Sequence, residues 1–287
     1  MRTFRTVAEL RAQLALERHP DRKIGLVPTM GAFHDGHRSL MRDARRSCDY
    51  VVVSLFVNPT QFGANEDLSA YPRDEERDAQ IAEQEGVDVL FAPHAQEVYP
   101  DGFATTVHVA GPAVGLEGAH RPGHFDGVAT VVAKLLNMAQ PDIAFFGQKD
   151  AQQAAVIRQL VRDLNMPVRI EVRPTVREPD GLAMSSRNAY LEPAERERAI
   201  ALRKALDATE HAAAAGERDA QALEEAARAA LSAYAIEPEY VALVHADTLV
   251  PITRLDTTDR VLVAVAARVG RARLIDNTVI DPRALGD

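Results

Sequence analysis

The sequence contains a single cysteine, Cys48, among its 287 residues. One thiol can form neither an internal disulfide framework nor a cysteine-rich metal site, so Cys48 is expected to pack as a small apolar side chain. No apolar run approaches the roughly 18 residues that span a bilayer, and the opening residues lack the apolar core of a secretory signal. We therefore expect a cytoplasmic protein that does not bind membranes.

Positive charge is also scarce, because 33 Lys and Arg residues stand against 42 Asp and Glu residues, a net charge of −9. Without a basic face, a nucleic-acid-binding surface is not expected. The hydrophobic fraction of 46% and the charged fraction of 26% are those of a globular protein. An acidic protein that binds an anionic substrate must concentrate its cations and backbone N–H groups at the site. Motifs that place Lys, Arg or His beside glycine are therefore the most informative ones.

Strand-like apolar runs alternate with helical patterns through about residue 175. The predicted strands are 24–28, 50–57, 87–92, 143–146 and 168–172, and the predicted helices are 37–47, 74–85, 125–139 and 150–164. Continuous Val, Ile, Leu and Phe strands separated by helices indicate a parallel sheet covered on both faces. The expected fold class is α/β, with a Rossmann-like doubly wound sheet that binds ligands at the carboxyl ends of its strands.

The pattern changes after about residue 176. Residues 193–235 are rich in Ala, Glu and Arg and predict two helices broken at Gly216. Residues 240–244, 261–266 and 274–280 predict a small antiparallel sheet. A run of helices followed by a run of strands indicates a separate, smaller α+β domain at the C-terminal end. The predicted domains are therefore 1–176 and 177–287.

The segment from Val27 to His37 carries the clearest chemical signal. A predicted strand ends there, glycines allow the backbone to approach a ligand, and a helix begins near His37 with N–H groups that attract phosphate. His34 and His37 can share one face of the first turn and stabilise a leaving pyrophosphate. A His-x-x-His pair alone is more often a helix cap with solvated histidines, and a zinc site would need a third ligand that the nearby sequence lacks. The strand–glycine–helix setting favours phosphate binding.

Two further segments carry cations or hydroxyls beside glycine. Residues 146–150 end a predicted strand with Lys149, a point positive charge, and Asp150, a plausible N-cap. A strand-end lysine is more often solvated, but this one lies at the mouth of the same sheet. Residues 181–188 place two serines before Arg187, which can wrap a triphosphate. Taken alone, this second segment is better explained as an ordinary helix-entry loop.

A fourth segment, residues 55–63, follows the long apolar strand and contains Asn58 and Gln61. The Gln61 amide offers a donor and an acceptor, which suits a polar, uncharged part of a substrate. The Asn-Pro pair that begins at Asn58 is a good turn former in any protein, so a structural turn is the alternative.

Together, and in this order, these segments resemble the pantothenate synthetase (pantoate–β-alanine ligase) family of the nucleotidyltransferase superfamily. The resemblance is carried by residues 28–37, 56–62, 71–73, 121–128, 146–150 and 184–188. The His-x-Gly-His and Met-Ser-Ser-Arg motifs also occur across the wider superfamily, whereas residues 56–62 and 121–128 indicate this family. The chain departs from the family pattern at Ala151, where an aromatic residue is usual, and at Arg77, where the family commonly has an acidic pair with the next residue.

The resemblance implies a cytoplasmic, homodimeric ligase that condenses (R)-pantoate with β-alanine to give pantothenate. ATP is consumed to AMP and pyrophosphate through a pantoyl-adenylate intermediate, with Mg²⁺ bridging the ATP phosphates. His37 would take the family's catalytic role, while His34 and Lys149 would steady the phosphates. The residues implied in ATP binding are Thr29, Met30, Gly31, His34, Gly36, His37, Gly147, Gln148, Lys149, Asp150, Val176, Met184, Ser185, Ser186 and Arg187. Those implied in substrate binding are Gln61, Gln153 and Asn58. Residues 1–176 would bind nucleotide and pantoate, and residues 177–287 would cover the site.

Three other functions fit parts of the pattern. Another adenylyl- or cytidylyltransferase of the same fold would exchange pyrophosphate without pantoate. In a nucleotide-binding regulatory module, His37→Ala would change the affinity for the nucleotide without abolishing turnover. An aminoacyl-tRNA synthetase is disfavoured by the acidic charge and by the lack of a basic RNA-binding extension.

Overall fold

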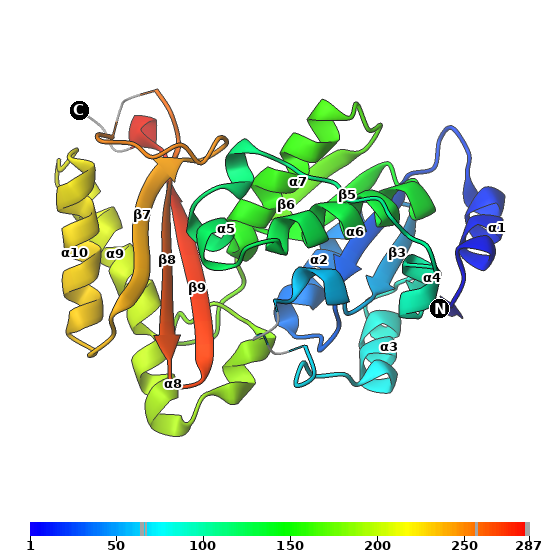
Figure 1. Cartoon of the computed structure of the whole chain (residues 1–287), viewed down its shortest axis with the longest axis horizontal. Coiled ribbons are helices and arrows are strands. Elements are labelled where there is room, and N and C mark those ends of the chain that lie inside the picture. Colours follow the sequence, from blue (N-terminus) through cyan, green and yellow to red (C-terminus); the bar gives the residue numbers. More distant parts are fainter. Residues whose placement is uncertain (64–65, 67, 256–257, 285–287) are drawn as a thin grey trace. The chain divides into compact units, whose positions relative to one another are not determined.

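The computed structural model describes residues 1–63, 66, 68–255 and 258–284 (Figure 1). The chain divides into two compact units. The first comprises Met1–Gly147 and Val156–Pro174, and the second comprises Gln148–Ala155 and Thr175–Asp287. Each unit contains its own clusters of buried apolar side chains. One of the three boundaries between the units falls inside a helix, α7 (Ala151–Asp163), after Ala155.

The first unit is built on a six-stranded parallel sheet in the order β1-β4-β3-β2-β5-β6. The strands are β1 (Arg2–Phe4), β2 (Ile24–Thr29), β3 (Tyr50–Leu55), β4 (Val89–Phe91), β5 (Ile143–Gly147) and β6 (Arg169–Arg173). The five strands from β4 to β6 follow the order of nucleotide-binding doubly wound sheets, in which the direction of winding reverses between β2 and β5. The predicted fold class is confirmed.

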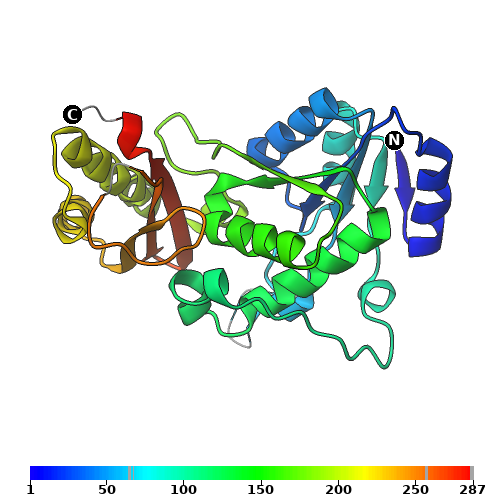
Figure 2. The ribbon, with the colours of Figure 1, turned by 90° about the horizontal axis from the view of Figure 1, so that it is seen from above.

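Helices cover both faces of this sheet (Figure 2). They are α1 (Val7–Glu17), α2 (Asp35–Ser47), α3 (Glu75–Gln84), α4 (Ala95–Val98), α5 (Leu116–His120) and α6 (His124–Ala139), with most of α7 and the short 3-10 turns η1 (Pro59–Gln61) and η2 (Gly111–Ala113). Leu26 and Val52 pack with α1, α6 and α7, whereas Val27, Val51 and Val53 pack with α2 and α3. Because both faces of the sheet are covered, successive strand residues are apolar, which is why the strands were visible as continuous hydrophobic runs.

Cys48 ends α2 and is buried beneath β2. A Cβ placed on Gly25 would lie 2.9 Å from its Sγ, so sulfur and strand backbone are in close contact. Burial, and secondarily the carboxylate of Asp142, raises the pKa of the Cys48 thiol to about 11. The thiolate is therefore scarce at neutral pH, and the predicted role as a small apolar side chain is confirmed.

The second unit contains a three-stranded antiparallel sheet in the order β7-β8-β9. Its elements are η3 (Gln148–Asp150), η4 (Ser186–Tyr190), α8 (Pro193–Ala199), α9 (Ala201–Ala214), α10 (Ala220–Ser232), β7 (Pro238–His245), β8 (Val261–Val269), β9 (Ala272–Ile280) and η5 (Pro282–Ala284). Helix α9 packs on β8 and β9, and α10 packs on β7. The predicted α+β region is confirmed, although the stretch before Gly216 forms two helices that meet at Ile200 and not one.

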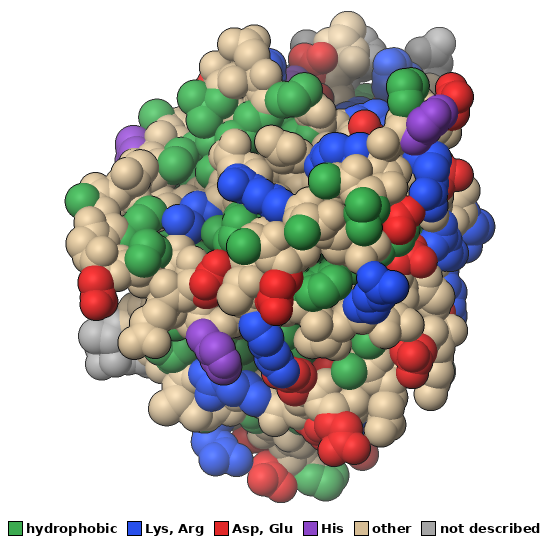
Figure 3. Space-filling view, turned by 90° about the vertical axis from the view of Figure 1, so that its right-hand side faces the viewer, with side chains coloured by type: hydrophobic (Ala, Val, Ile, Leu, Met, Phe, Trp, Pro, Cys, Tyr) green, Lys and Arg blue, Asp and Glu red, His purple; other side chains and the backbone are tan. Residues whose placement is uncertain are grey.

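Positive and negative side chains are interspersed on the surface. The face shown in Figure 3 mixes Lys and Arg side chains with Asp and Glu. Arg38 and Arg45 of α2, for example, form ion pairs of 2.6 Å with Glu85 and 2.7 Å with Asp88. Over the parts of the chain that the structure describes, none of the helices is long and apolar enough to cross a membrane.

Candidate active site

The carboxyl ends of β2 and β5 mark the point where the winding of the sheet reverses. Strand β2 pairs with β3 on one side and with β5 on the other, so the segments that follow β2 and β5 leave toward opposite faces. β2 ends at Thr29, whose Oγ1 donates a 2.6 Å hydrogen bond to the carbonyl of Ser54 in β3, and β5 ends at Gly147. Two of the predicted ATP-binding segments therefore begin at the switch point, where doubly wound folds bind ligands.

The loop after β2 is held in an unusual conformation by a buried carboxylate. Gly31 and Ala32 have φ values of +92° and +52°, in the left-handed region. Asp78 of α3 is 1% exposed and accepts hydrogen bonds of 2.8 Å from the N–H groups of Ala32 and Phe33. A side chain at position 31 would have to share space with Asp78 and Leu55, 2.9 and 2.7 Å from its Cβ. Glycine at 31 is thus required by both conformation and space.

The two histidines cap the start of α2. His34 is the N-cap residue, and its Nδ1 accepts a 3.1 Å hydrogen bond from the N–H of Gly36. His37 Nδ1 accepts a 3.3 Å bond from the N–H of His34. The rings lie side by side, with centroids 4.2 Å apart. Because a ring nitrogen that accepts from N–H carries no proton, each neutral imidazole has its proton on Nε2. Both rings can therefore donate from Nε2 to an anion, although part of the first-turn N–H set is used in capping.

The turn η1 places Gln61 beside this segment. The Oε1 of Gln61 accepts a 3.0 Å hydrogen bond from Nδ2 of Asn58, and its Nε2 lies 3.2 Å from Sδ of Met30. Asn58 is 1% exposed and also donates to the carbonyl of Gly127 in α6 at 3.1 Å. A Cβ at Gly127 would lie 2.4 Å from the carbonyl oxygen of Thr60, so α6 approaches the turn as closely as glycine allows. Met30, a predicted ATP-binding residue, is therefore in contact with Gln61, a predicted substrate-binding residue of the same unit.

A buried histidine fixes the backbone of the same turn. His124 is 9% exposed, and its Nδ1 lies 2.8 Å from the carbonyl oxygen of Gln61, which can only accept. Nδ1 therefore carries the proton, and Nε2 accepts from Arg121 at 3.0 Å. Arg121 in turn forms two 2.7 Å bonds to Glu66. Burial, and then the charge of Arg121, lowers the pKa of His124 to about 4. Burial acts to raise the pKa of Glu66, but the hydrogen bond and charge of Arg121, together with His124 and the Gly63 backbone, lower that pKa on balance.

The His124 imidazole is expected to make the stability of the protein pH-dependent. In the unfolded chain the ring binds a proton near pH 6.5, but in the folded protein only near pH 4. Its contribution is therefore complete above pH 6.5 and is lost as the pH falls, by roughly 2 kcal/mol between pH 7.5 and pH 5. Urea unfolding at both pH values would measure it. His124→Asn keeps a donor near the Gln61 carbonyl but does not titrate. Between the two pH values, the unfolding free energy of His124→Asn should therefore fall by roughly 2 kcal/mol less than that of the wild-type protein. Equal losses in the two proteins would contradict the assignment.

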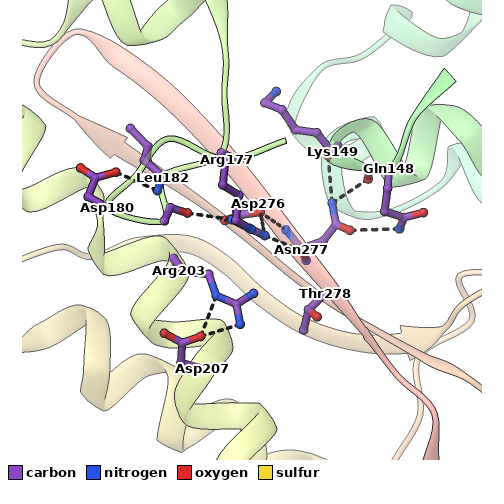
Figure 4. Close-up of polar contacts among 12 residues, drawn as sticks. Gln148, Lys149, Arg177, Asp180, Leu182, Arg203, Asp207, Asp276, Asn277 and Thr278 are labelled. Carbon is purple, nitrogen blue, oxygen red and sulfur yellow. Dashed lines mark hydrogen bonds and ion pairs between the residues drawn. The ribbon is translucent and has the colours of Figure 1, made fainter. Parts of the chain in front are cut away.

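The remaining predicted ATP-binding residues lie in the second unit. Lys149 of η3 is paired with Asp150 at 3.6 Å. The N–H of Met184 donates a 3.0 Å hydrogen bond to the carbonyl of Val176, so these two predicted residues are adjacent. Ser185 caps η4, and its Oγ accepts a 3.2 Å hydrogen bond from the N–H of Arg187. This is the capping contact expected of a helix-entry loop. Figure 4 shows Gln148 and Lys149 against Asn277 of β9, a residue for which no role was predicted.

The structure brings some predicted residues together and assigns others to different units. In the first unit, Thr29 and Met30 lead into the His34–His37 segment, Gln61 contacts Met30, and Asn58 contacts Gln61. Gln153, predicted to bind pantoate with Gln61, lies on the first turn of α7 in the second unit. The ligand roles of all these residues stay predictions. Residues missed by the sequence argument are Asp78, Arg121, His124, Asp276 and Asn277, all of which act on backbone or side chains that lie far away in the chain.

The described residues also bear on metal binding. Among residues 1–63, 66, 68–255 and 258–284, no group of three or more His, Cys, Asp or Glu side chains could hold a metal ion. His34 and His37 are thus a pair without a third protein ligand in that part of the chain.

Comparison with known proteins identifies the family. The family model for pantoate-beta-alanine ligase matches residues 2–279. The pantothenate synthetase of Roseiflexus castenholzii is 52% identical over 282 residues, covering 98% of this chain and 100% of that protein. Pantothenate synthetase 1 of Bradyrhizobium diazoefficiens is 53% identical over 280 residues, covering 98% of each.

Solved structures agree with the sequence comparison. The crystal structure of pantothenate synthetase from Thermus thermophilus matches with a TM-score of 0.90 at 49% identity, covering 98% of this chain and 99% of that one. The pantoate-beta-alanine ligase of Francisella tularensis, solved as a complex with beta-gamma ATP and beta-alanine, matches with a TM-score of 0.80 at 35% identity over the same fractions. Over nearly its whole length, this chain belongs to the pantoate-beta-alanine ligase family.

Proposed function

We propose that this protein condenses (R)-pantoate with β-alanine to form pantothenate, using ATP and releasing AMP and pyrophosphate. The observation that carries the proposal is the pair of histidines after β2 whose Nδ1 atoms each accept a backbone N–H, in a chain that matches the family along its length. The relative from Francisella tularensis was solved with beta-gamma ATP and beta-alanine, two of the three substrates named here.

The first step would form pantoyl adenylate. A carboxylate oxygen of pantoate attacks the α-phosphorus of ATP, the bond from that phosphorus to the bridging oxygen breaks, and pyrophosphate leaves with the electron pair. Negative charge grows on the leaving group. His34 and His37 can donate from Nε2 at the positive end of the α2 dipole and so stabilise it. By the family resemblance, Lys149 would add a full positive charge. No protein nucleophile is required, since positioning and charge stabilisation suffice.

The second step would transfer the acyl group. The neutral amine of β-alanine attacks the acyl carbon, the bond to the AMP oxygen breaks, AMP leaves as an anion and the new amide nitrogen gives up a proton to solvent. Gln61 can hold the hydroxyl groups of pantoate through an amide that donates and accepts. Its side chain is oriented by Asn58 and its backbone by His124, so the substrate would meet a preorganised partner.

Mg²⁺ belongs to this proposal as part of the substrate. The described residues offer no cluster of acidic or imidazole ligands for it, whereas triphosphate oxygens are strong Mg²⁺ ligands. The ion would therefore enter bound to ATP and offset phosphate charge. By analogy with the family, the protein is also proposed to be a cytoplasmic homodimer.

The decisive experiment is to mix the protein with ATP, Mg²⁺, pantoate and β-alanine and to detect pantothenate and AMP by mass spectrometry. Exchange of labelled pyrophosphate into ATP, measured without β-alanine, tests the adenylate. We expect exchange only when pantoate is present. Exchange without pantoate, or only with another acid or nucleotide, would indicate a different nucleotidyltransferase, and absence of both products would overturn the proposal.

A further inference from the structure

Strand β9 carries two adjacent polar residues, Asp276 and Asn277, that are both buried. Alternate residues of this strand, Leu274 and Ile280 among them, face the apolar core of the second unit. Asp276 lies on that same face and Asn277 on the opposite one, yet they are only 2% and 5% exposed. Buried polar side chains on a strand need specific partners, so the contacts of this pair are informative.

Asn277 holds η3 through two backbone carbonyl groups and one side-chain amide. Its Nδ2 donates to the carbonyl oxygens of Gln148 at 3.0 Å and Lys149 at 2.9 Å, and its Oδ1 accepts from Nε2 of Gln148 at 3.0 Å. Two carbonyl oxygens can only accept, so the orientation of the amide is fixed. In Figure 4 the Lys149 side chain extends away from Asn277. Asn277 therefore fixes the backbone of Lys149 and does not bind its ammonium group.

Asp276 holds a second segment of the same unit. Its carboxylate forms hydrogen bonds of 2.6 and 3.0 Å with the two terminal nitrogens of Arg177. Arg177 also donates to the carbonyl of Gly181 at 3.0 Å and pairs through its backbone with Ala183. The backbone pairing closes the 178–182 loop and continues in the 3.0 Å hydrogen bond from the N–H of Met184 to the carbonyl of Val176, so it fixes the start of the Met184–Arg187 segment. A bidentate Arg–carboxylate pair of this kind fixes geometry as well as charge (Figure 4).

We propose that Asp276 and Asn277 are positioning residues for ATP, which fix the Lys149 segment and the Met184–Arg187 loop to one strand. The inference rests on the proposed ATP-binding role of those two segments. They are about 35 residues apart in sequence, and adjacent side chains of β9 hold one each. If Lys149 and the Met184–Arg187 loop bind the same triphosphate, they must be held at a fixed separation. Attachment to one strand fixes that separation.

The test is a steady-state analysis of pantoate-dependent pyrophosphate exchange in Asn277→Ala, Asn277→Asp and Asp276→Asn. Each variant is expected to raise the KM for ATP, by roughly 10- to 100-fold in Asn277→Asp, whose carboxylate repels the two carbonyl oxygens. The KM for pantoate should stay within about twofold of wild type. Val279→Ala is the matched control, because Val279 lies two residues along β9 on the same face and is exposed. It should leave both constants unchanged.

A merely structural role would give a different result. If Asn277→Ala and Asn277→Asp fold, as judged by thermal unfolding, and the two KM values rise together or neither rises, the positioning role is wrong. If Asn277→Asp fails to fold, the uncharged Asn277→Ala alone decides. Lys149→Ala separates this inference from the proposed function. If the KM for ATP rises in Lys149→Ala but not in the β9 variants, only the inference is wrong. If the KM for ATP does not rise in Lys149→Ala, the proposed ATP site itself is wrong.

Discussion

Replacing His37 with alanine is expected to slow pantoate-dependent pyrophosphate exchange by roughly two to three orders of magnitude. His37 Nδ1 accepts from the N–H of His34, so the ring proton is on Nε2 and can be donated to phosphate charge that grows as pyrophosphate leaves. Alanine removes this donor from the transition state. The measurement is the initial rate of exchange at saturating ATP and pantoate, with circular dichroism to show that the fold is intact.

The same imidazole is also part of the α2 cap, so its structural contribution must be separated. Alanine at position 37 loses the cap contact and is expected to cost about 1 kcal/mol of unfolding free energy. His37→Gln is the control, because glutamine at the third residue of a helix can still accept from the N-cap N–H. We expect near wild-type stability but low activity in His37→Gln. Wild-type exchange in His37→Ala would rule out the catalytic role.

Removing the Asp78 carboxylate is expected to cause the largest loss of stability. Asp78→Ala leaves the N–H groups of Ala32 and Phe33 buried without their acceptor, at roughly 1–3 kcal/mol each. Burial raises the pKa of Asp78 despite those two bonds, so the protein keeps a carboxylate where one is costly, which indicates that the loop conformation requires it. The KM for ATP should rise as well, because the loop carries Gly31 and leads into His34. Urea unfolding and exchange kinetics measure the two effects.

Two companion variants calibrate this result. Asp78→Asn keeps one acceptor but turns an NH₂ group toward the other N–H, so it should lose about half as much stability as Asp78→Ala. Glu76 is exposed on the same helix, and Glu76→Ala should change the unfolding free energy by less than about 0.5 kcal/mol. If Asp78→Ala were as stable as Glu76→Ala, the two hydrogen bonds would not be what holds the loop.

The sheet was predictable because each of its central strands is a continuous apolar run. Covering on both faces makes Val51, Val52 and Val53 apolar together, and a run of that kind separated from the next by a helical pattern has few other structures. Strand β1, only Arg2 to Phe4, was not predicted. Three residues show no periodicity, and their strand conformation comes from pairing with β4, far away in the sequence.

The candidate site was predictable where the chemistry is local and not where it depends on distant partners. The spacing of His34 and His37 placed both on one helical turn, but their shared tautomer follows from backbone contacts that only the structure shows. Asp78, His124 and Asn277 contact segments that lie 45 or more residues away in the chain, so no local pattern predicts these contacts. His124 lies in the 121–128 segment that carries the family resemblance, and Asp276 and Asn277 are a polar pair within β9, but neither pattern identifies the partner.

The buried cysteine has a practical consequence. Because Cys48 is the only thiol in the chain and its pKa is raised to about 11, maleimide reagents should label the wild-type protein slowly at neutral pH. A single cysteine introduced at an exposed position in each unit would then be labelled selectively, without first removing the native residue. Fluorescence energy transfer between two such dyes could follow the distance between the units as ATP and pantoate bind.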